Sequence, residues 1–236
     1  MRPRSAGMTL AEMAPTTRFN NRAEAGRALA DAVYDQLARP QDNTAPDAAP
    51  VVRPVVVLGL ARGGVPVAVE VAARLTAPVD VLVVRKLGAP TQPEFAFGAI
   101  AEGGVTFIDA ATVAALNLLP DDVAQVKFNE SLELKDRVRK YRADRPLLDV
   151  REKHVVLVDD GLATGATMQA AIRLAEDNDA AAITVAIPVA APEAIALLQA
   201  KADVVWLRAP SDFGAVGYFY KDFNSPTDDE IRALLG

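Results

Sequence analysis

Short runs of apolar residues alternate with helical patterns along most of the chain. The apolar runs predict strands at positions 55–60, 79–84, 155–158, 182–187 and 203–207. Apolar residues at helical spacing predict helices at positions 19–37, 65–75, 121–142, 165–176 and 192–200. Because strands alternate with helices, we expect an α/β fold with a doubly wound, mainly parallel sheet flanked by helices.

Two other segments interrupt this alternation. Positions 95–101 and 105–108 are separated by a Glu-Gly-Gly sequence, and this pattern predicts a β-hairpin. Positions 87–94 hold a glycine, two prolines and polar residues, a composition typical of a mobile loop. Near the end of the chain, Thr227 and Glu230 have the spacing of a capping box, which predicts a last helix.

The pattern is weakest near the start of the chain. Positions 1–17 lack a periodic pattern and are predicted to form a flexible N-terminal tail. Positions 39–54 hold four prolines and predict an exposed connection. We therefore expect a single domain over 18–236, with its core at about 52–208 and a small C-terminal aromatic hood or tail at 209–236.

The composition narrows the classes of function. Half of the residues are hydrophobic (51%) and few are aromatic (6%), as in a parallel sheet covered by helices. A net charge of −6 argues against a nucleic-acid partner. The absence of cysteine excludes disulfides and thiolate metal sites, and one histidine excludes a multi-histidine site. With no membrane-length apolar run and no signal-peptide pattern, we expect a cytoplasmic protein without a membrane partner.

The strand at 155–158 ends on two adjacent acids, Asp159 and Asp160, and small residues lead from there into the next helix. Ligands of open α/β sheets bind at such corners, where carboxylates accept hydrogen bonds from hydroxyls and a helix start donates N–H groups to an anion. A sugar phosphate needs both kinds of group. One alternative is an ordinary turn with two solvated aspartates. Another is a Walker B strand, although no G-x-x-x-x-G-K-[ST] motif accompanies it.

Three further segments hold residue types that are candidates for ligand binding. Ala61-Arg62-Gly63-Gly64 follows the first strand and forms a second corner between a strand and a helix, where glycines allow a close backbone approach and Arg62 adds charge. Arg85 and Lys86 follow the strand at 79–84 and place two cations at its expected end, or they are ordinary surface charges. Aromatic residues are concentrated at 213–223, where they either stack on a flat base or pack on the core.

The sequence Val158-Asp-Asp-Gly-Leu-Ala-Thr-Gly-Ala-Thr167 resembles the motif by which type I phosphoribosyltransferases bind phosphoribosyl pyrophosphate (PRPP). The resemblance implies that Asp159 and Asp160 bind the ribose hydroxyls and reach Mg²⁺ through water. The resemblance also implies which residues bind the pyrophosphate and the 5′-phosphate of PRPP. The pyrophosphate site would comprise Ala61, Arg62, Gly63, Gly64, Arg85 and Lys86. The 5′-phosphate site would comprise Ala163, Thr164, Gly165, Ala166 and Thr167.

By the same resemblance, the protein is expected to transfer the phosphoribosyl group to a nitrogenous base in purine or pyrimidine salvage, and to form a homodimer. The residues expected to bind the base are Phe213, Val216 and Tyr218. In 6-oxopurine enzymes of the family an aspartate stands where this chain has Ala163, so the catalytic general base is expected to be Glu94 or Glu102. The alternative function is that of a PRPP-binding regulator without transferase activity.

Overall fold

A computed structural model describes residues 18–38, 53–143 and 145–236. Its main sheet has five parallel strands, which are β1 (Val55–Leu60), β2 (Val79–Leu82), β6 (His154–Val158), β7 (Ala182–Val189) and β8 (Asp203–Arg208). They lie in the order β2-β1-β6-β7-β8. The predicted parallel sheet is confirmed, and each predicted strand of this sheet is present with its bounds shifted by at most two residues.

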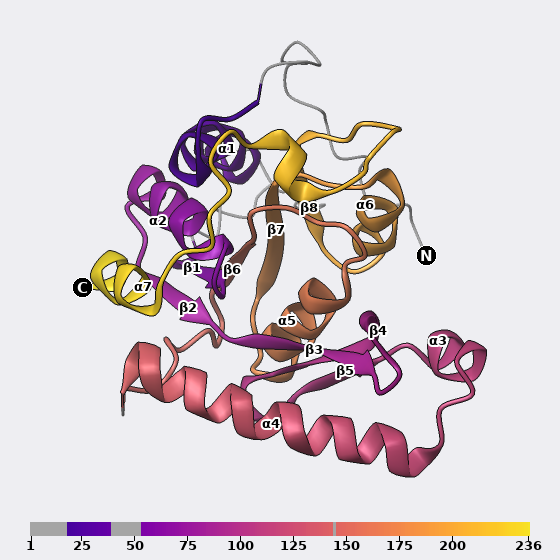
Figure 1. Cartoon of the computed structure of the whole chain (residues 1–236). Coiled ribbons are helices and arrows are strands. Elements are labelled where there is room, and N and C mark those ends of the chain that lie inside the picture. Colours follow the sequence, from indigo (N-terminus) through magenta and orange to yellow (C-terminus); the bar gives the residue numbers. More distant parts are fainter. Residues whose placement is uncertain (1–17, 39–52, 144) are drawn as a thin grey trace, which may run out of the picture.

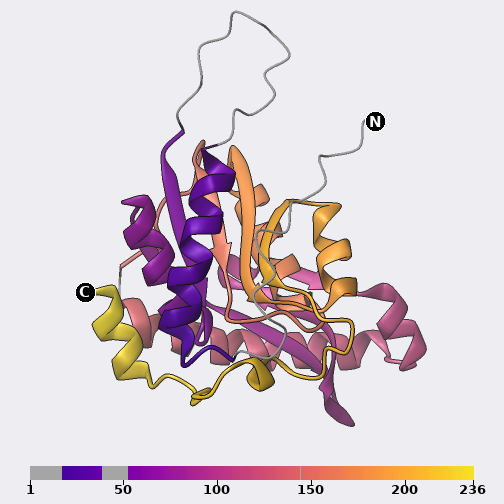
Figure 2. The ribbon, with the colours of Figure 1, turned by 90° about the horizontal axis from the view of Figure 1, so that it is seen from above.

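Helices cover both faces of the main sheet (Figures 1 and 2). One face is covered by α1 (Arg22–Leu37) and α2 (Gly64–Leu75), and the other by α5 (Ala166–Asp177) and α6 (Pro192–Gln199). Side chains of β6 alternate between the two faces, because Val156 and Val158 join the core under α1 and α2 while Val155 and Leu157 join the core under α5. The continuous apolar run of this strand therefore fills two cores at once.

A second sheet lies on the far side of α5 (Figure 1). Its antiparallel strands are β3 (Val84–Ala89), β4 (Gln92–Ala101) and β5 (Thr106–Ile108), in the order β3-β4-β5. A 3-10 turn, η1 (Glu102–Gly104), joins the last two strands, as the predicted hairpin requires. The long helix α4 (Pro120–Arg142) covers the outer face of this sheet, and the short helix α3 (Ala110–Ala115) precedes it.

Two predictions for this region were wrong. The run at 79–84 is divided between β2 and β3, so that Arg85 and Lys86 lie within a strand of the second sheet and not after a strand's end. Positions 87–94, predicted as a mobile loop, belong mostly to the β3–β4 hairpin. A Cβ at Gly88 would lie 2.3 Å from the carbonyl oxygen of Pro93. Glycine there allows the two strands to pair closely, and this contact between the strands cannot be read from loop composition.

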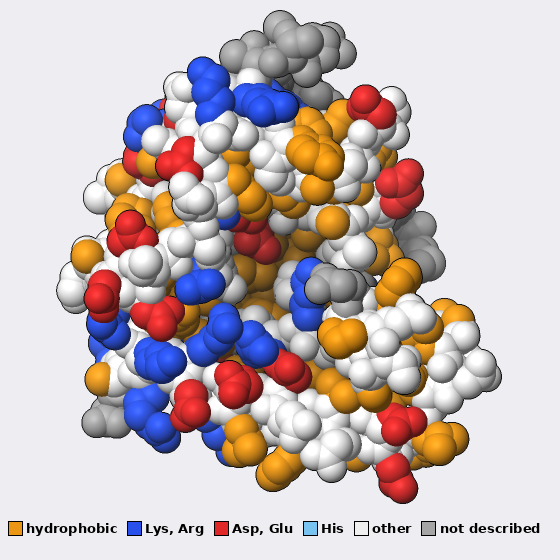
Figure 3. All heavy atoms as spheres, in the orientation of Figure 1, with side chains coloured by type: hydrophobic (Ala, Val, Ile, Leu, Met, Phe, Trp, Pro, Cys, Tyr) orange, Lys and Arg blue, Asp and Glu red, His pale blue; other side chains and the backbone are white. Residues whose placement is uncertain are grey.

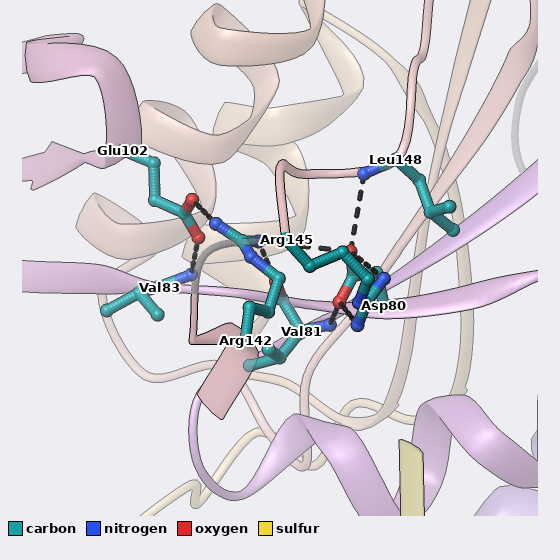
Figure 4. Close-up of polar contacts among 7 residues, drawn as sticks. All are labelled: Asp80, Val81, Val83, Glu102, Arg142, Arg145 and Leu148. Atoms are coloured by element: carbon teal, nitrogen blue, oxygen red, sulfur yellow. Dashed lines mark hydrogen bonds and ion pairs between the residues drawn. The ribbon is translucent and has the colours of Figure 1, made fainter. Parts of the chain in front are cut away.

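A buried charged cluster joins the two sheets where the chain passes from β2 to β3 (Figure 4). Asp80 is fully buried and accepts two hydrogen bonds of 3.2 Å from Arg145. Glu102 accepts a 2.8 Å hydrogen bond from the backbone N–H of Val83 and pairs with Arg142. Arg142 is also 3.9 Å from Asp80, so one guanidinium lies between two buried carboxylates. These contacts fix the end of α4 against both sheets.

The C-terminal segment packs against the N-terminal end of α1 and includes the 3-10 turn η2 (Val216–Phe219) and the last helix α7 (Asp228–Leu235). Phe19 pairs in parallel with Tyr220, its N–H donates to the carbonyl of Phe219 at 2.9 Å, and the two rings of Phe19 and Tyr220 lie 5.6 Å apart. The predicted capping box is confirmed at Thr227. Within the ranges described above, none of the helices has the length and apolar character needed to cross a membrane.

Candidate functional site

The order of strands in the main sheet reverses between β1 and β6. From β1 the chain moves outward to β2, whereas β6 on the other side of β1 leads to β7 and β8. The loops that leave the carboxyl ends of β1 and β6 therefore part in opposite directions and open a crevice between them, which is where open α/β sheets bind ligands. Ala61 begins the first loop and Asp159 begins the second.

A pocket of about 730 Å³ opens at this edge. Figure 3 shows the same face as a hollow with acidic side chains inside it and basic side chains along the rim nearest α4. The lining includes most of the β6–α5 loop, the strand β3 with its hairpin, one face of α4 and two C-terminal residues. Among the lining residues are Ala61, Arg85, Lys86, Glu130, Arg137, Asp159, Asp160, Gly161, Ala163, Thr164, Gly165, Thr167, Val216 and Phe223.

The two adjacent acids of the motif have different surroundings. The carboxylate of Asp159 accepts a 2.9 Å hydrogen bond from the backbone N–H of Asp160. The carboxylate of Asp160 accepts a 2.7 Å hydrogen bond from Nε of Arg22, and both side chains of this pair are largely buried. In addition, the hydroxyl of Tyr220 donates to the carbonyl oxygen of Asp160 at 2.6 Å.

Burial raises the pKa of Asp159 well above its usual value, and the charge of Asp160 raises it further. Lys86 and Arg22 act in the opposite direction on this pKa. Burial also raises the pKa of Asp160, against the opposite effect of Arg22. Two adjacent half-buried acids with raised pKa values that both line a pocket are typical of a site that binds a polar or cationic ligand.

Two glycines let the β1–α2 loop approach these acids. A Cβ at Gly63 would lie 2.0 Å from Oδ2 of Asp160, and a Cβ at Gly64 would lie 2.4 Å from the carbonyl oxygen of Val158. A side chain at position 63 would therefore displace the Asp160 carboxylate, and a side chain at position 64 would push the two corners apart. The loop and the acids form one rigid floor under the pocket.

The β6–α5 loop is anchored to the neighbouring strand. The N–H of Leu162 donates to the carbonyl of Val189 at 2.9 Å, and the carbonyl of Leu162 accepts from Ala191 at 2.8 Å. With Leu162 buried, Ala163 and Thr164 stay exposed at the pocket. Gly165 has a φ of +81° and turns the chain into α5, and both Gly165 and Thr167 line the same pocket as the two acids.

Three cations face the same pocket from the opposite side. Arg85 and Lys86 extend from β3, and Arg137 extends from α4. Arg85 pairs with Glu130 at 2.7 Å, and each side chain is 24% exposed. The pocket therefore has acids and helix N–H groups on one side and basic side chains on the other.

Several predicted residues do not line the pocket. Arg62 extends toward α7, where it lies 3.9 Å from Asp228. Tyr218 is 66% exposed. Phe213 stacks on Phe219 with the ring centres 5.7 Å apart, so the alternative of aromatic packing holds for this ring. Gly63, Gly64 and Ala166 lie behind the lining and shape it through the backbone.

The prediction for Glu102 needs correction. Its carboxylate is buried in the cluster with Arg142, where burial raises its pKa while the hydrogen bonds from Arg142 and Val83 lower it, and it does not line the pocket. A group that is held there cannot reach an acceptor in the pocket. The side chain of Glu94 is outside the described part of the structure.

The sequence prediction missed several side chains at the site, among them Arg137 of α4, Arg22 and Phe223. Arg22 reaches Asp160 from the first turn of α1, and Phe223 lines the pocket beside Val216. The guanidinium carbon of Arg22 lies 4.0 Å from the centre of the Phe223 ring. The aromatic run at 213–223 signalled Phe223, whereas no local pattern marks Arg22, because its partner lies 138 residues away.

A family model described as the phosphoribosyl transferase domain matches residues 51–222. The chain belongs to the phosphoribosyl transferase family. A protein of Mycobacterium tuberculosis H37Rv, provisionally named as phosphoribosyl transferase Rv0571c, is 42% identical over 218 residues, which cover 92% of this chain and 46% of that protein. The chain therefore spans about half the length of this relative.

A solved structure supports the fold. The crystal structure of TT1426 from Thermus thermophilus is 40% identical, covers 93% of this chain and 98% of that one, and superposes with a TM-score of 0.74. The parallel sheet with helices on both faces is therefore that of a phosphoribosyl transferase fold.

Phosphoribosyl transferases generally use magnesium with PRPP. The part of the chain that the structure describes has no group of three or more histidine, cysteine or acidic side chains that would hold a metal ion unaided. Magnesium commonly binds through one or two carboxylates together with water and substrate phosphates. Asp159 lines the pocket and has no ion-pair partner among the described residues, so it fits contact with a substrate-bound ion.

Proposed function

We propose that this chain transfers the 5-phosphoribosyl group of PRPP to a nitrogen atom of a purine or pyrimidine base and releases pyrophosphate. One observation carries the proposal. The acids Asp159 and Asp160, the N-terminus of α5 and the cations Arg85, Lys86 and Arg137 all line one pocket of about 730 Å³. A sugar that carries phosphate groups at both ends requires this combination of acceptors and donors.

Each group has a role in this reaction. The acidic corner at Asp159 and Asp160 faces the ribose and accepts hydrogen bonds from its hydroxyls. The backbone of 163–167 donates to the 5′-phosphate together with the hydroxyls of Thr164 and Thr167. Lys86, Arg85 and the β1–α2 loop receive the pyrophosphate. In the reaction, the bond from C1 to the pyrophosphate oxygen breaks and its electron pair leaves with pyrophosphate. A base nitrogen then bonds to C1 and loses its proton.

The protein contributes position and charge to this step. The transition state resembles a sugar cation, so fixed carboxylates below the ribose stabilise it and fixed cations stabilise the departing pyrophosphate. Magnesium, when bound with PRPP, would neutralise part of the pyrophosphate charge. Asp159 is the residue that would hold it, through water.

The acceptor base is expected beside Val216 and Phe223, the two C-terminal residues that line the pocket. Both side chains are apolar, and an aromatic ring offers a face on which a flat base stacks. Glu94, on the β3–β4 hairpin, is the remaining general base from the sequence prediction. Closure of this hairpin over PRPP would exclude water from the reactive sugar.

Calorimetric titration of magnesium-PRPP tests the proposal. We expect the wild-type protein to bind, Asp159→Asn to lose binding, and Asp177→Asn to bind as the wild type does. Asp177 ends the same helix and forms an exposed ion pair with Arg173, so this variant controls for the loss of a charge. A wild-type protein that does not bind PRPP would refute the proposal.

A screen for pyrophosphate release tests the transfer step. Purines and pyrimidines are added with PRPP, and release that depends on one base identifies the acceptor. If PRPP binds but no base yields pyrophosphate, the protein is a PRPP-binding regulator and the transferase proposal is wrong.

A further inference from the structure

The first turn of α1 supplies a charged residue to the site from outside the segment 51–222 that the family model matches. Arg22 is 8% exposed, and its Nε donates to Oδ2 of Asp160 at 2.7 Å. The two side chains are 9% and 13% exposed, so water competes weakly for this ion pair. A charge-assisted hydrogen bond in such a place is among the stronger polar contacts of a protein.

Asp160 is held from three directions. Arg22 holds its carboxylate, Tyr220 donates to its carbonyl oxygen at 2.6 Å, and Gly63 lies so close to Oδ2 that a Cβ there would come within 2.0 Å. Turning this carboxylate toward a ligand would break the ion pair and leave a buried guanidinium without its partner. That rearrangement is costly.

The Asp159 side chain has no arginine partner of this kind among the described residues. Its carboxylate accepts one hydrogen bond, from the backbone N–H of Asp160, and forms no ion pair with any residue that the structure describes. Two carboxylate oxygens can accept several hydrogen bonds, so Asp159 keeps capacity for ligand hydroxyls and for metal-bound water. The two adjacent acids are thus unequal.

We infer that Arg22 is a positioning residue that fixes Asp160 as part of the floor of the site, so that Asp159 is the acid that engages the ribose of PRPP. This inference rests on the proposed function and refines it. Asp160 acts through its pair with Arg22, because the pair sets the position of the Asp160 backbone N–H that holds the Asp159 carboxylate.

Arg22 also links this floor to the C-terminal side of the pocket. Its Nη1 donates to the carbonyl of Asn224 at 2.7 Å, and its guanidinium carbon lies 4.0 Å from the centre of the Phe223 ring. Cation–π contact of this kind stabilises a ring in place. One guanidinium therefore positions both the acid under the ribose and the ring beside the acceptor.

The inference is tested by magnesium-PRPP titration of single and double variants. We expect Asp159→Asn to weaken binding by about 100-fold and Asp160→Asn by about 10-fold, because only the first loses a ligand contact. We expect Arg22→Ala to weaken binding by about 10-fold, and Arg22→Ala/Asp160→Asn to be no weaker than either single variant, because both act through one pair. Arg22→Lys, which keeps the charge but loses one of the two directed donors, should lie between Arg22→Ala and wild type.

Arg27→Ala is the matched control. Arg27 lies on the same helix and pairs with Glu70 at 2.9 Å, but its side chain is 61% exposed. Its loss should leave PRPP affinity unchanged. Thermal denaturation of every variant confirms that titration is performed on folded protein, and if Arg22→Ala does not fold, the comparison of Asp160→Asn with Asp159→Asn and the Arg22→Lys variant decide the question.

Each outcome has a distinct meaning. Equal losses for Asp159→Asn and Asp160→Asn would overturn the inference, as would additive losses in the double variant. Unchanged or tighter PRPP binding by Arg22→Ala would also overturn the inference. Arg22 would then not position Asp160 for binding, and in the case of tighter binding it would compete with the ligand for this carboxylate. A wild-type protein that does not bind PRPP would instead overturn the proposed function itself.

Discussion

Among the described residues, two places hold buried arginines against carboxylates that are largely shielded from water. One is the pair of Arg22 and Asp160 under the pocket, and the other is the cluster of Asp80, Glu102 and Arg142 where the two sheets meet (Figure 4). Burial raises the pKa of Glu102 as it raises the pKa of Asp160. A raised pKa alone therefore does not distinguish a ligand site from an architectural contact.

The two regions differ in whether a carboxylate is left with free hydrogen-bonding capacity. In the cluster, both carboxylates have an arginine and a backbone N–H as partners, among them Arg145 and Leu148 for Asp80. Beside the pocket, Asp159 has a single backbone partner and no ion pair in the described residues. A buried acid with spare capacity next to open space is what marks a site for a ligand. The following variants test this difference, in order of their expected effect on the free energy of unfolding.

The largest effect is expected in the cluster. Arg142→Ala leaves Glu102 without its cation and should lower the free energy of unfolding by about 3–5 kcal/mol, as urea denaturation would measure. Arg139→Ala, on the same helix, removes an exposed pair with Asp136 and should cost less than about 1 kcal/mol. Equal effects of the two variants would mean that the cluster does not hold the sheets together.

A smaller effect is expected from Gly64→Ala. The added methyl would lie 2.4 Å from the carbonyl oxygen of Val158, and relief of this clash should cost about 1–3 kcal/mol and move the β1–α2 loop away from Asp159. Gly161→Ala adds the same methyl group at the pocket lining, where it meets the side chain of Val216 and no backbone atom is among its nearest contacts. We expect the first variant to lose PRPP affinity and more stability than the second, and the reverse order would show that backbone approach does not define the floor.

Asp159→Asn should stabilise the fold while it removes PRPP binding. At neutral pH the folded protein holds a buried charge here at a cost, so the amide should raise the free energy of unfolding by about 0.5–2 kcal/mol. Because burial raises the pKa of Asp159 above its value in the unfolded chain, protonation favours the folded state. The wild type should therefore approach the variant in stability as the pH falls through the folded-state pKa, which denaturation at several pH values measures.

The smallest effect is expected from Tyr220→Phe. It removes the hydroxyl that donates to the carbonyl of Asp160, and should cost about 0.5–1.5 kcal/mol of stability with a slight loss of PRPP affinity. Tyr218→Phe is the control, because Tyr218 is 66% exposed. If Tyr218→Phe lost more stability or PRPP affinity than Tyr220→Phe, the hydrogen bond from Tyr220 to Asp160 would not be the contact that matters in the C-terminal segment.

The sequence predicted the β6–α5 corner because the signals for it are local. The apolar run at 155–158, the two acids and the glycine at position 165 lie close together in the sequence, and the structure places them at the end of β6 and the start of α5. The main sheet was predictable for the same reason, since buried parallel strands read as continuous apolar runs.

The second sheet and the environment of the acids were less predictable, because they depend on contacts between distant residues. Loop composition at 87–94 did not reveal the pairing of β3 with β4. Arg62 was expected at the pyrophosphate site but turns toward Asp228 of the last helix, and Glu102 was expected in the pocket but pairs with Arg142. In each case a partner far along the chain decides where the side chain lies.

The pairing of Phe19 with Tyr220 joins the two ends of the described chain, and it has a consequence for protein synthesis. The ribosome releases Val216 and Phe223 after every other residue that lines the pocket. A nascent chain that has emerged only as far as α6 already contains the acids and the phosphate loop, but neither of the side chains proposed to receive the base. The acceptor side of the pocket is therefore completed after the phosphate side, when the C-terminal segment returns to pack against α1.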